Sequence, residues 1–531
     1  MSQRSRKTKR PTAAPGRRAA SPAVAEAPPR WPFLPAVLLA VAALAVLAFF
    51  VSLRLRAAQP WSYDEYYHLG LARSMWSDFR IESFRWTPFS LFFDHFADKE
   101  PLFHLLLMPF TGLSLEQAGL YGTLLGQIFI VGVFAWILWR LRVPHAPLVL
   151  LALTALGPMF ALRAEMCRPH IWLIGFSLLV LGLLAMNASW KVLVPVCALF
   201  GLAHTGGWIA IPFATVWAVA GFVSKESGGA EQTPRRLDWQ PLAAAAGGWL
   251  LGQLIHPNVP ENFRLFWRVN FVIPYQSTAG SAALRSQIGA ELTPPEGIVL
   301  LEQIPAFVAP VLVVFFLLFN QRLRTRATLT AAVFGLAFLV IGSFFLRRFF
   351  ELGAPLSLLA LALIFRERQA EGPVRRRSKA WPAVAAIAIL CGASWTWLLT
   401  SAYGFGASSP PRAMAEWLAE RGKPGERVFT AQWADSAPLF YSAPQLQSLV
   451  VLDPTFFLAK DPQLFETYVR IVQGRHPDPV RAIRERFGAR WVTIWKQPAF
   501  QGLATQIGRT PGVIAPFNTD DYVVFDLRST G

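Results

Sequence analysis

Two acidic residues, Asp64 and Glu65, lie shortly after the first long apolar segment of the chain, among aromatic side chains. A carboxylate at the edge of a lipid bilayer is costly to keep in apolar surroundings, so acids at this depth are candidates for a functional site. Ser62 and Glu65 also have the spacing of a capping box, at the start of a helix expected to run to about Trp76. Capping accounts for Glu65 but not for Asp64, whose side chain would share a helix face with His68.

A second polar element, Asp98-Lys99-Glu100, stands directly before Pro101. As a structural element it is a polar loop that leads into a helix, with Glu100 as the N-terminal cap and proline in the first turn. As a functional element it offers Lys99 as a point charge for a phosphate group, with Asp98 or Glu100 orienting the ammonium. Both interpretations are open.

A cluster of charge interrupts two apolar segments at Arg163, Glu165, Arg168 and His170. A single arginine at a helix end can reach water and anchor the helix. Two arginines with an acid and a histidine, on the side of the membrane that basic residues usually avoid, are harder to explain in this way. The cluster therefore favours a site.

The same anomaly recurs at Arg347 and Arg348, with Glu351 one turn further along for an ion pair. The planar donor fork of arginine suits the oxygen atoms of a phosphate group. A helix-end anchor explains these arginines equally well.

The elements that must position these side chains are membrane helices. The chain has 531 residues, of which 54% are hydrophobic and only 15% charged, as in an integral membrane protein. Eleven apolar segments approach or reach the length of about 20 residues that a helix needs to cross a bilayer. They lie at residues 34–53, 117–139, 146–162, 169–189, 190–205, 207–223, 240–256, 300–319, 327–346, 349–366 and 381–400.

The net charge of +18 comes from short basic blocks between these segments, which is a topology signal and not a nucleic-acid-binding patch. With the N-terminus in the cytoplasm, the blocks in the large loops fall on the cytoplasmic side. We expect a disordered basic cytoplasmic tail at 1–30, a transmembrane domain at 31–401 and external loops at 54–116 and 257–299. The stretch Pro101–Leu113 is too short to cross and is expected to lie at the outer interface.

Residues 402–531 have ordinary polar content, and we expect an extracytoplasmic α/β domain there. An amphipathic helix is predicted at 478–488, ended by glycine and followed by a strand. Strands are predicted at Arg427–Thr430, Leu449–Leu452, Trp491–Trp495 and Tyr522–Asp526.

Three further features have adequate structural explanations. The three cysteines lack metal-ligand spacing or a disulfide pattern. His204 lies at a predicted outer turn with a polar tip. The loop 257–299, with His256 just before it and Asn258 at its start, is long enough for a mobile flap, and most of it is expected to be flexible surface.

The chain resembles the membrane-embedded glycosyltransferases of the C-type (GT-C) fold, which include protein O-mannosyltransferases and the lipid A aminoarabinose transferase. The resemblance rests on the acid pair after the first span, the Lys99-Glu100-Pro101 element that opens an interface helix, and the arginine-containing turn before the fourth span. It covers residues 30–400 in architecture and a few short motifs in sequence. It implies a polyprenyl-phosphate sugar donor and transfer on the extracytoplasmic side.

The resemblance also implies roles for single residues. Asp64 matches the acid assigned as catalytic base, and Glu165 lies in the region of a second external acid. Lys99 matches a lysine near the donor phosphate. The family's histidine-proline-proline or glutamate-lysine-proline is replaced here by Lys99-Glu100-Pro101, which leaves the register of this lysine open by one position. Arg347 or Arg348 falls where the family places a phosphate-binding arginine.

We therefore predict an inverting glycosyltransferase of a bacterial inner membrane, with Asp64, beside Glu65, as general base. The donor phosphate would be held by Lys99 and by an arginine, either from Arg347 and Arg348 or from Arg163 and Arg168. Its partners are membrane lipid, the polyprenyl-phosphate sugar and a hydroxyl or amine acceptor.

The sequence requires no cofactor, but a divalent metal would fit if Asp64, Glu65 and Glu165 converged as oxygen ligands. The alternative function is a multi-span transporter or a flippase for a lipid-linked saccharide. That class predicts charges near the middle of spans and internal repeats, whereas almost every charge here lies at a span end.

Overall fold

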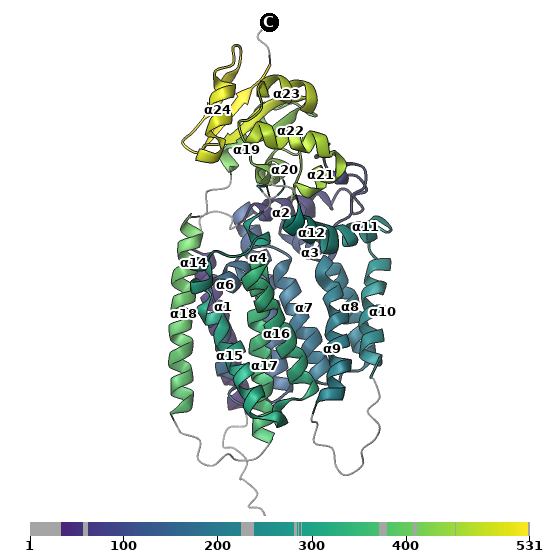
Figure 1. Cartoon of the computed structure of the whole chain (residues 1–531), viewed down its shortest axis with the longest axis vertical. Helices are drawn as coiled ribbons and strands as arrows, with labels where there is room; N and C mark the ends of the chain where they lie inside the picture. The colour runs from purple at the N-terminus through teal and green to yellow at the C-terminus, as the bar shows by residue number, and fades with distance from the viewer. Residues whose placement is uncertain are drawn as a thin grey trace, which may run out of the picture.

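The computed structural model describes residues 33–56, 62–224, 238–280, 284, 286–287, 289–370, 380–406, 411–451 and 453–528. A bundle of long helices makes up most of it, and a smaller region with a β-sheet stands over one end of the bundle (Figure 1). Short helices, among them α2 (Tyr63–Ser74), α3 (Pro101–Leu107), α11 (Glu261–Trp267) and α12 (Ile273–Ala279), lie between the two parts.

Each of the eleven apolar segments forms one helix or a run of consecutive helices. They are α1 (Leu34–Arg54), α4 (Leu115–Arg140), α5 (Ala146–Leu151) with η3 (Ala152–Ala155) and α6 (Pro158–Ala164), α7 (His170–Ala185), α8 (Trp190–Ala203), η4 (Thr205–Ile209) with α9 (Ala210–Val223), α10 (Gln240–Leu254), α15 (Ile304–Phe319), α16 (Arg326–Phe344), α17 (Phe350–Ala370) and α18 (Trp381–Gly406). Within the described residues, six helices are long and apolar enough to cross a membrane, or seven if one bent pair forms a single span. The helical, multi-pass membrane fold is confirmed, and the number of eleven crossings stays a prediction.

The bent pair is the third predicted segment, in which α5 and η3 meet α6 at an angle of 92°. The break occurs at Gly157, whose φ of +94° is open to glycine and strained for other residues. Pro158 then starts α6 in its first turn, where its missing N–H costs no hydrogen bond. The bend turns the end of α6, which carries Arg163, toward the short elements at the end of the bundle.

The short elements between bundle and sheet come mainly from the loops that follow α1 and α10. The first loop forms α2 (Tyr63–Ser74), η1 (Leu91–Phe93), α3 (Pro101–Leu107) and η2 (Met108–Phe110). The second forms α11 (Glu261–Trp267), a π-helical turn η5 (Arg268–Val272), α12 (Ile273–Ala279), η6 (Ala290–Leu292) and α14 (Gly297–Glu302). Two further 3-10 turns belong to other connections: η7 (Gln321–Leu323) precedes α16, and η8 (Arg347–Phe349) precedes α17. The apolar helix predicted at Pro101–Leu113 is observed as α3 and η2.

The C-terminal region is a five-stranded mixed sheet with helices around it. Strands β1 (Arg427–Thr430), β2 (Gln447–Ser448), β3 (Ala489–Trp495), β4 (Ile514–Asn518) and β5 (Tyr522–Asp526) stand in the order β2-β1-β3-β5-β4. The pairs with β1 are parallel and the other two are antiparallel. The helical elements are α19 (Arg412–Arg421), η9 (Trp433–Asp435), α20 (Ser436–Ser442), α21 (Thr455–Lys460), α22 (Pro462–Val472), α23 (Pro479–Phe487), η10 (Pro498–Phe500) and α24 (Gln501–Gly508).

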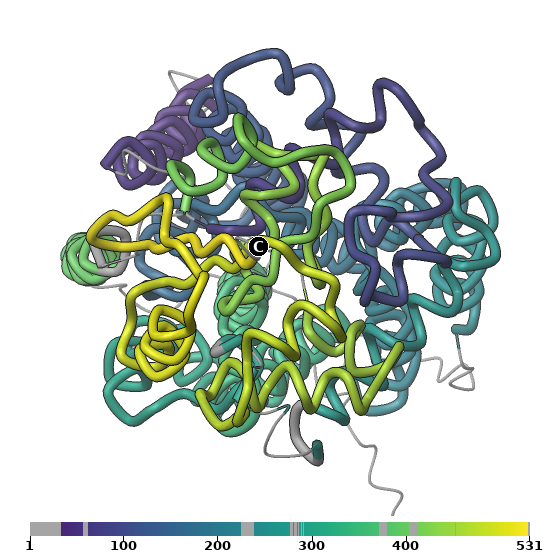
Figure 2. The backbone as a smooth tube through the Cα atoms, turned by 90° about the horizontal axis from the view of Figure 1, so that it is seen from above, coloured from purple at the N-terminus to yellow at the C-terminus, as the bar shows by residue number. Residues whose placement is uncertain are grey.

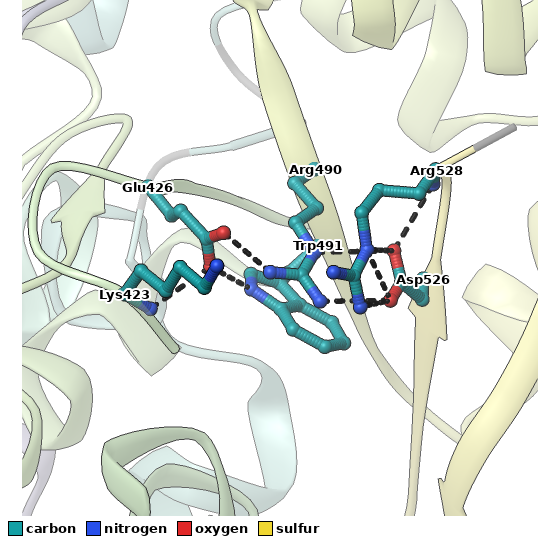
Figure 3. A network of polar contacts seen from close by, with 6 residues as sticks. All are labelled: Lys423, Glu426, Arg490, Trp491, Asp526 and Arg528. Atoms are coloured by element: carbon teal, nitrogen blue, oxygen red, sulfur yellow. Dashed lines mark hydrogen bonds and ion pairs between the residues drawn. The ribbon is translucent and has the colours of Figure 1, made fainter. Parts of the chain in front are cut away.

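A charged network joins β3 to its neighbours (Figure 3). Arg490 on β3 forms ion pairs with Glu426, just before β1, and with Asp526 on β5, the latter at 3.0 Å. Trp491 donates its indole N–H to Glu426 at 2.9 Å, and Arg490 lies over the Trp491 ring. The network lies within the sheet and supports the alignment of these strands.

The C-terminal region packs directly on α2, and in the view from above it lies over the ends of the bundle helices (Figure 2). The Phe440 ring of α20 fits against Gly70 of α2, where a Cβ atom would come within 2.9 Å of it. Arg73 lies over the Tyr441 ring and donates to the Tyr441 carbonyl. The helix that carries Asp64 is thus attached to the C-terminal region along one side.

Candidate functional site

A cavity of about 460 Å³ opens where the short helices, the bundle and the C-terminal region meet. Apolar side chains of α12, α16 and α17 form part of its wall, and charged or polar groups form the rest. The titratable groups that line it are Asp64, Lys99, Glu100, Arg168, His170, His204, Glu291, Arg348, Glu351 and Asp453. Most of the residues singled out in the sequence therefore meet in one place.

Asp64 lies in the first turn of α2, where the helix dipole favours a negative charge. Its carboxylate forms an ion pair with Arg168, which also contacts Glu291 at 3.3 Å. The Asp64 side chain is 23% exposed, whereas that of Arg168 is 13% exposed. Arg168 thus orients an acid that still faces the cavity.

Two cations of the cavity, Lys99 and Arg348, have no carboxylate within ion-pair distance among the described residues. The Lys99 ammonium lies over the ring of Phe456, 5.3 Å from its centroid. Arg348 donates to Nε2 of His170 at 2.8 Å, which is a neutral partner for a charged guanidinium. These two positive charges are available to an anionic ligand.

Arg163 does not line the cavity, and acids already neutralise its charge. It forms an ion pair with Glu291, and its Nε lies 3.0 Å from Glu351. The sequence had suggested an ion pair between Glu351 and its neighbouring arginines, but Glu351 pairs with Arg163 instead. Of those neighbours only Arg348 lines the cavity; Arg347 donates its backbone N–H to the Thr293 carbonyl and lies outside the cavity wall.

Glu65 and Glu165 are fully buried in a second cluster around Arg54. Arg54 contacts Glu65 at 2.5 Å and donates to the Glu165 carbonyl at 3.0 Å. Gln127 donates to the Glu165 carboxylate at 3.4 Å. Neither acid lines the cavity, so Asp64, Glu65 and Glu165 do not converge, which was the condition for a metal held by these three acids.

The predicted capping box is also absent. Ser62 occupies the N-cap position of α2, but its side chain makes no capping hydrogen bond. Glu65 is drawn to Arg54 instead, because a buried guanidinium needs a counter-charge more than a helix end needs a cap. Helix α2 ends at Ser74, close to the predicted end.

One interpretation of the sequence had Asp98 orienting Lys99, but the Asp98 carboxylate contacts His104 instead. His104 donates from Nδ1 to Asp98 at 2.7 Å, and its Nε2 accepts from Nδ1 of His68 at 2.8 Å. Burial disfavours the charge on Asp98, but the His104 contact and a hydrogen bond from the Glu100 N–H outweigh it and lower the pKa of Asp98. Burial and the neighbouring His104 lower the pKa of His68 well below its usual value.

Glu100 stands at the N-cap of α3, as predicted, although its carboxylate makes no capping hydrogen bond. Burial raises the pKa of Glu100 to about 7, despite the nearby charge of Lys99. Within the described residues, His68, Glu100 and His104 form the one group of ligand atoms close enough to hold a metal ion. Two imidazole nitrogens and a carboxylate suit Zn²⁺, and the carboxylate of Asp98 behind His104 is the arrangement that commonly orients zinc-binding histidines.

Three cavity residues were missed or discounted in the sequence. Glu291 had no signal of its own, because its partners Arg163 and Arg168 are distant in sequence. Burial opposes ionisation of Glu291, yet these two arginines hold its pKa well below the usual range. His204 does form the expected turn, accepting from the Gly206 N–H at 2.8 Å, but its ring also lines the cavity. Asp453 comes from the C-terminal region.

Part of the loop 257–299, expected to be flexible, is attached to the loop that carries Lys99. His256 Nε2 donates to the Asp98 carbonyl at 3.0 Å, and Asn258 accepts from the Asp98 N–H at 3.1 Å. Asn258 also donates to the Ile81 carbonyl at 2.8 Å. These contacts join the two long loops, so that Lys99 and Glu291 can line the same cavity.

No family model matches the sequence, and no curated protein sequence matches it significantly. Solved structures do match it over almost its whole length. ArnT from Cupriavidus metallidurans in the apo state is 18% identical, with a TM-score of 0.57 over 93% of this chain and 98% of that one. The same protein bound to undecaprenyl phosphate is 16% identical, with a TM-score of 0.52 over 94% of this chain and 99% of that one.

A second similar structure is the arabinofuranosyltransferase AftD from Mycobacteria. It is 14% identical, with a TM-score of 0.53 over 93% of this chain and 40% of that one. ArnT and AftD are both GT-C membrane glycosyltransferases, and the resemblance noted in the sequence extends to the arrangement of the whole chain. The protein therefore has the fold of the GT-C membrane glycosyltransferases.

Proposed function

We propose that this protein is a glycosyltransferase that moves a sugar from a polyprenyl-phosphate donor to a hydroxyl or amine acceptor, with inversion at the anomeric carbon. One observation carries the proposal: a single cavity contains a carboxylate, Asp64, together with two cations, Lys99 and Arg348, that have no carboxylate partner among the described residues. A base and an unneutralised phosphate site are the two groups that such a transfer needs.

In the proposed reaction the acceptor oxygen or nitrogen attacks the anomeric carbon as the bond from that carbon to the phosphate oxygen breaks. Asp64 takes the proton of the acceptor, a role typically worth about 10²- to 10⁴-fold in rate. The lipid phosphate leaves as an anion, so no acid is needed to protonate it. Arg168 holds the Asp64 carboxylate in position throughout.

Lys99 and Arg348 stabilise the charge that grows on the leaving phosphate. Such electrostatic stabilisation counts most where water is excluded, and the apolar walls of the cavity provide that setting. Arg168 is a third positively charged residue of the cavity, but its guanidinium already pairs with Asp64 and Glu291. Arg163, which is paired with Glu291 and Glu351, has no direct part.

The donor lipid is proposed to be undecaprenyl phosphate carrying a sugar, in a bacterial inner membrane, and the reaction to take place on the extracytoplasmic face. The ligand of the similar ArnT structure, undecaprenyl phosphate, supports this lipid. The basic blocks between spans support a cytoplasmic N-terminus and an extracytoplasmic C-terminal region.

The test is transfer of radiolabelled sugar from a panel of polyprenyl-phosphate sugars by the purified protein in lipid nanodiscs. We expect release of polyprenyl phosphate by the wild type and its loss in Asp64→Asn. If no donor is consumed by the wild type, a lipid-linked saccharide flippase becomes the better proposal, and transbilayer movement of the same donors would then be measured.

A further inference from the structure

The segment Asp453–Phe456 of the C-terminal region reaches the cavity, although the sheet of that region lies above the bundle. Asp453 lines the cavity itself, and the Phe456 ring lies under the Lys99 ammonium. None of the roles assigned above to the bundle uses these two residues. Among the described residues of the C-terminal region, Asp453 alone lines the cavity.

Helix α21 holds this segment in place. The Phe456 ring is stacked on Phe92 of η1, with 4.4 Å between centroids, and is only 1% exposed. At the other end of α21, Lys460 forms an ion pair with Asp94 at 2.8 Å. Two contacts at opposite ends of a short helix leave it little freedom to turn.

Asp453 is held by the start of the same helix. Its Oδ1 accepts from the Thr455 N–H at 2.8 Å, which fixes the carboxylate at the cavity wall. The charges that act on it come from three directions: Lys99 and Glu291 across the cavity, and Arg268 on η5. Neither Lys99 nor Arg268 lies within ion-pair distance of Asp453. The carboxylate is therefore near enough to attract Lys99 but does not neutralise it.

We propose that Asp453 and Phe456 complete the donor-phosphate site from the C-terminal side. The Phe456 ring holds the Lys99 ammonium in position for the phosphate, and the Asp453 carboxylate competes with the phosphate for that ammonium, so that the product lipid phosphate is released. Phe456 is a positioning residue that acts through Lys99. This inference rests on the proposed function for its kinetic consequences, but not for binding of the lipid phosphate.

The two residues have opposite expected effects, which a merely structural role would not produce. A cation over an aromatic face in a desolvated place is strongly attracted to it, so Phe456→Leu should weaken binding of undecaprenyl phosphate by roughly 5- to 30-fold. Removing a like charge near the phosphate should strengthen its binding, by about 3- to 10-fold for Asp453→Asn at low salt. The stronger binding should be accompanied by slower release and a lower kcat.

The experiment measures the Kd for undecaprenyl phosphate in nanodiscs at pH 8, because burial raises the pKa of Asp453 and a high pH favours its charged form, at low and high salt. Phe457→Leu is the matched control for Phe456, because Phe457 is similarly buried on the same helix but packs on Phe465 and Tyr468. Asp478→Asn is the control for Asp453, because Asp478 caps the remote helix α23 through the same kind of hydrogen bond. Both controls should leave the Kd within about twofold of wild type.

A double-mutant cycle identifies the route of the effect. In a Lys99→Gln background, Phe456→Leu should cause no further loss of affinity, because the cation that it positions is gone. Equal effects of Phe456→Leu and Phe457→Leu, an undiminished effect without Lys99, or weaker binding by Asp453→Asn would each overturn the proposal. Binding that follows the expected pattern in a protein that transfers no sugar would refute the proposed function and leave the site intact.

Discussion

Asp64 and Glu65 are consecutive in the chain, yet they belong to two different charge clusters. Glu65 is fully buried against Arg54, and Gly119 of α4 leaves space for its carboxylate, since a Cβ there would lie 1.6 Å from Glu65 Oε1. Asp64, turned by about 100° around α2, faces the cavity and Arg168. The first cluster is closed by its own partners, and the second is open to a ligand.

The two clusters differ in which of their charges can act on a ligand. Around Arg54 the guanidinium and the Glu65 carboxylate form a buried ion pair, where removing either partner leaves an unpaired charge. In the cavity, Lys99 lies over an aromatic ring and Arg348 donates to His170, and neither has a carboxylate within ion-pair distance among the described residues. Two adjacent acids of similar chemistry therefore have different roles: Glu65 belongs to a structural ion pair, and Asp64 belongs to a candidate reactive site.

The largest expected effect is that of Asp64→Asn in the open cluster. The amide cannot accept a proton, so transfer should fall by about 10²- to 10⁴-fold, the usual contribution of a general base. The rate is measured in single-turnover assays with saturating donor, and the unfolding temperature of the variant verifies that it is folded. A variant that retains wild-type turnover would transfer the role of base to another cavity acid, and Glu291, the other partner of Arg168, is the first candidate.

Glu65→Gln, in the closed cluster, should lower stability and leave the transfer rate unchanged. Loss of one partner of a buried ion pair costs about 3–5 kcal/mol in free energy of unfolding, and the rate of the remaining folded protein should stay close to that of wild type. Thermal unfolding in nanodiscs and specific activity per folded molecule separate the two effects. Replacing both partners, as in Arg54→Met with Glu65→Leu, should restore much of the stability; a rate defect in a fully stable Glu65→Gln would contradict the distinction between the clusters.

The arginines allow the same contrast at the cations. Arg348→Gln should raise the Kd for the lipid phosphate by about 10- to 100-fold, because a hydrogen bond to a charged group contributes about 1.5–3 kcal/mol. Arg163→Gln is the matched variant: its two acids lose their partner, and stability should fall more than affinity. Equal losses of affinity in both variants would mean that Arg163 also reaches the ligand.

Glu100 lines the open cavity but is buried like the closed pair, and it should make stability depend on pH. Its pKa rises on folding to about 7, mainly because it is buried, so between its unfolded value and about pH 7 the folded state binds a proton that the unfolded state has lost. The stability that this proton confers is complete at low pH and falls as pH rises through that window. Glu100→Gln should therefore gain stability relative to wild type as pH rises, as unfolding temperatures measured with a chelator present at several pH values would reveal. A constant difference across that range would contradict the assignment.

The smallest effect expected is that of a metal at a third cluster, formed by His68, Glu100 and His104. This cluster is neither closed by ion pairs nor wholly open. We propose that Zn²⁺ replaces the proton shared by His68 and His104 and takes Glu100 as a third ligand. A ligand present at about tenfold its Kd stabilises the folded state by roughly 1.4 kcal/mol, so Zn²⁺ should raise the unfolding temperature and a chelator should reverse the rise. His104→Gln should abolish the response, and an unchanged response in that variant would place the metal elsewhere.

The membrane part of the fold could be predicted from the sequence because the bilayer imposes a length and a composition on every span. The sharp bend at Gly157 could not be predicted, because the helices on either side of it together have the pattern of one apolar segment. Helix–helix contacts, which no local pattern specifies, decide whether such a segment crosses the bilayer straight or turns back toward the site.

The sheet shows where a local pattern misleads. Strand β4 was not predicted, because Pro516 lies within its run and proline cannot donate to a strand ladder. β4 stands at the end of the sheet order, where one side of its backbone needs no partner, so the fold accommodates the proline. No strand forms over residues 449–451 of the one predicted at Leu449–Leu452, whose last residue lies outside the described part of the chain; the two-residue β2 lies just before them.

The candidate site was predictable where a residue was anomalous by itself. Asp64 stands out shortly after the first span, Lys99 directly before an interface helix and Arg348 at a span end, and all three line the cavity. Glu291 and Asp453 were not predictable in this way, because an acid in a polar loop is ordinary until its distant neighbours are known. Which of two adjacent acids faces the cavity depends on the rotation of α2, which the sequence pattern of that helix does not specify.

The position of Asp453 and Phe456 along the chain sets an order in time. Both residues follow α18, the last long helix of the bundle, so they are synthesised after the whole bundle. The bundle can therefore begin to insert and pack while the cavity still lacks Asp453 in its wall and Lys99 still lacks the Phe456 ring. A chain that stopped before Asp453 would have the helices of the bundle without the finished cavity, so a truncated product would bind its lipid at an incomplete site.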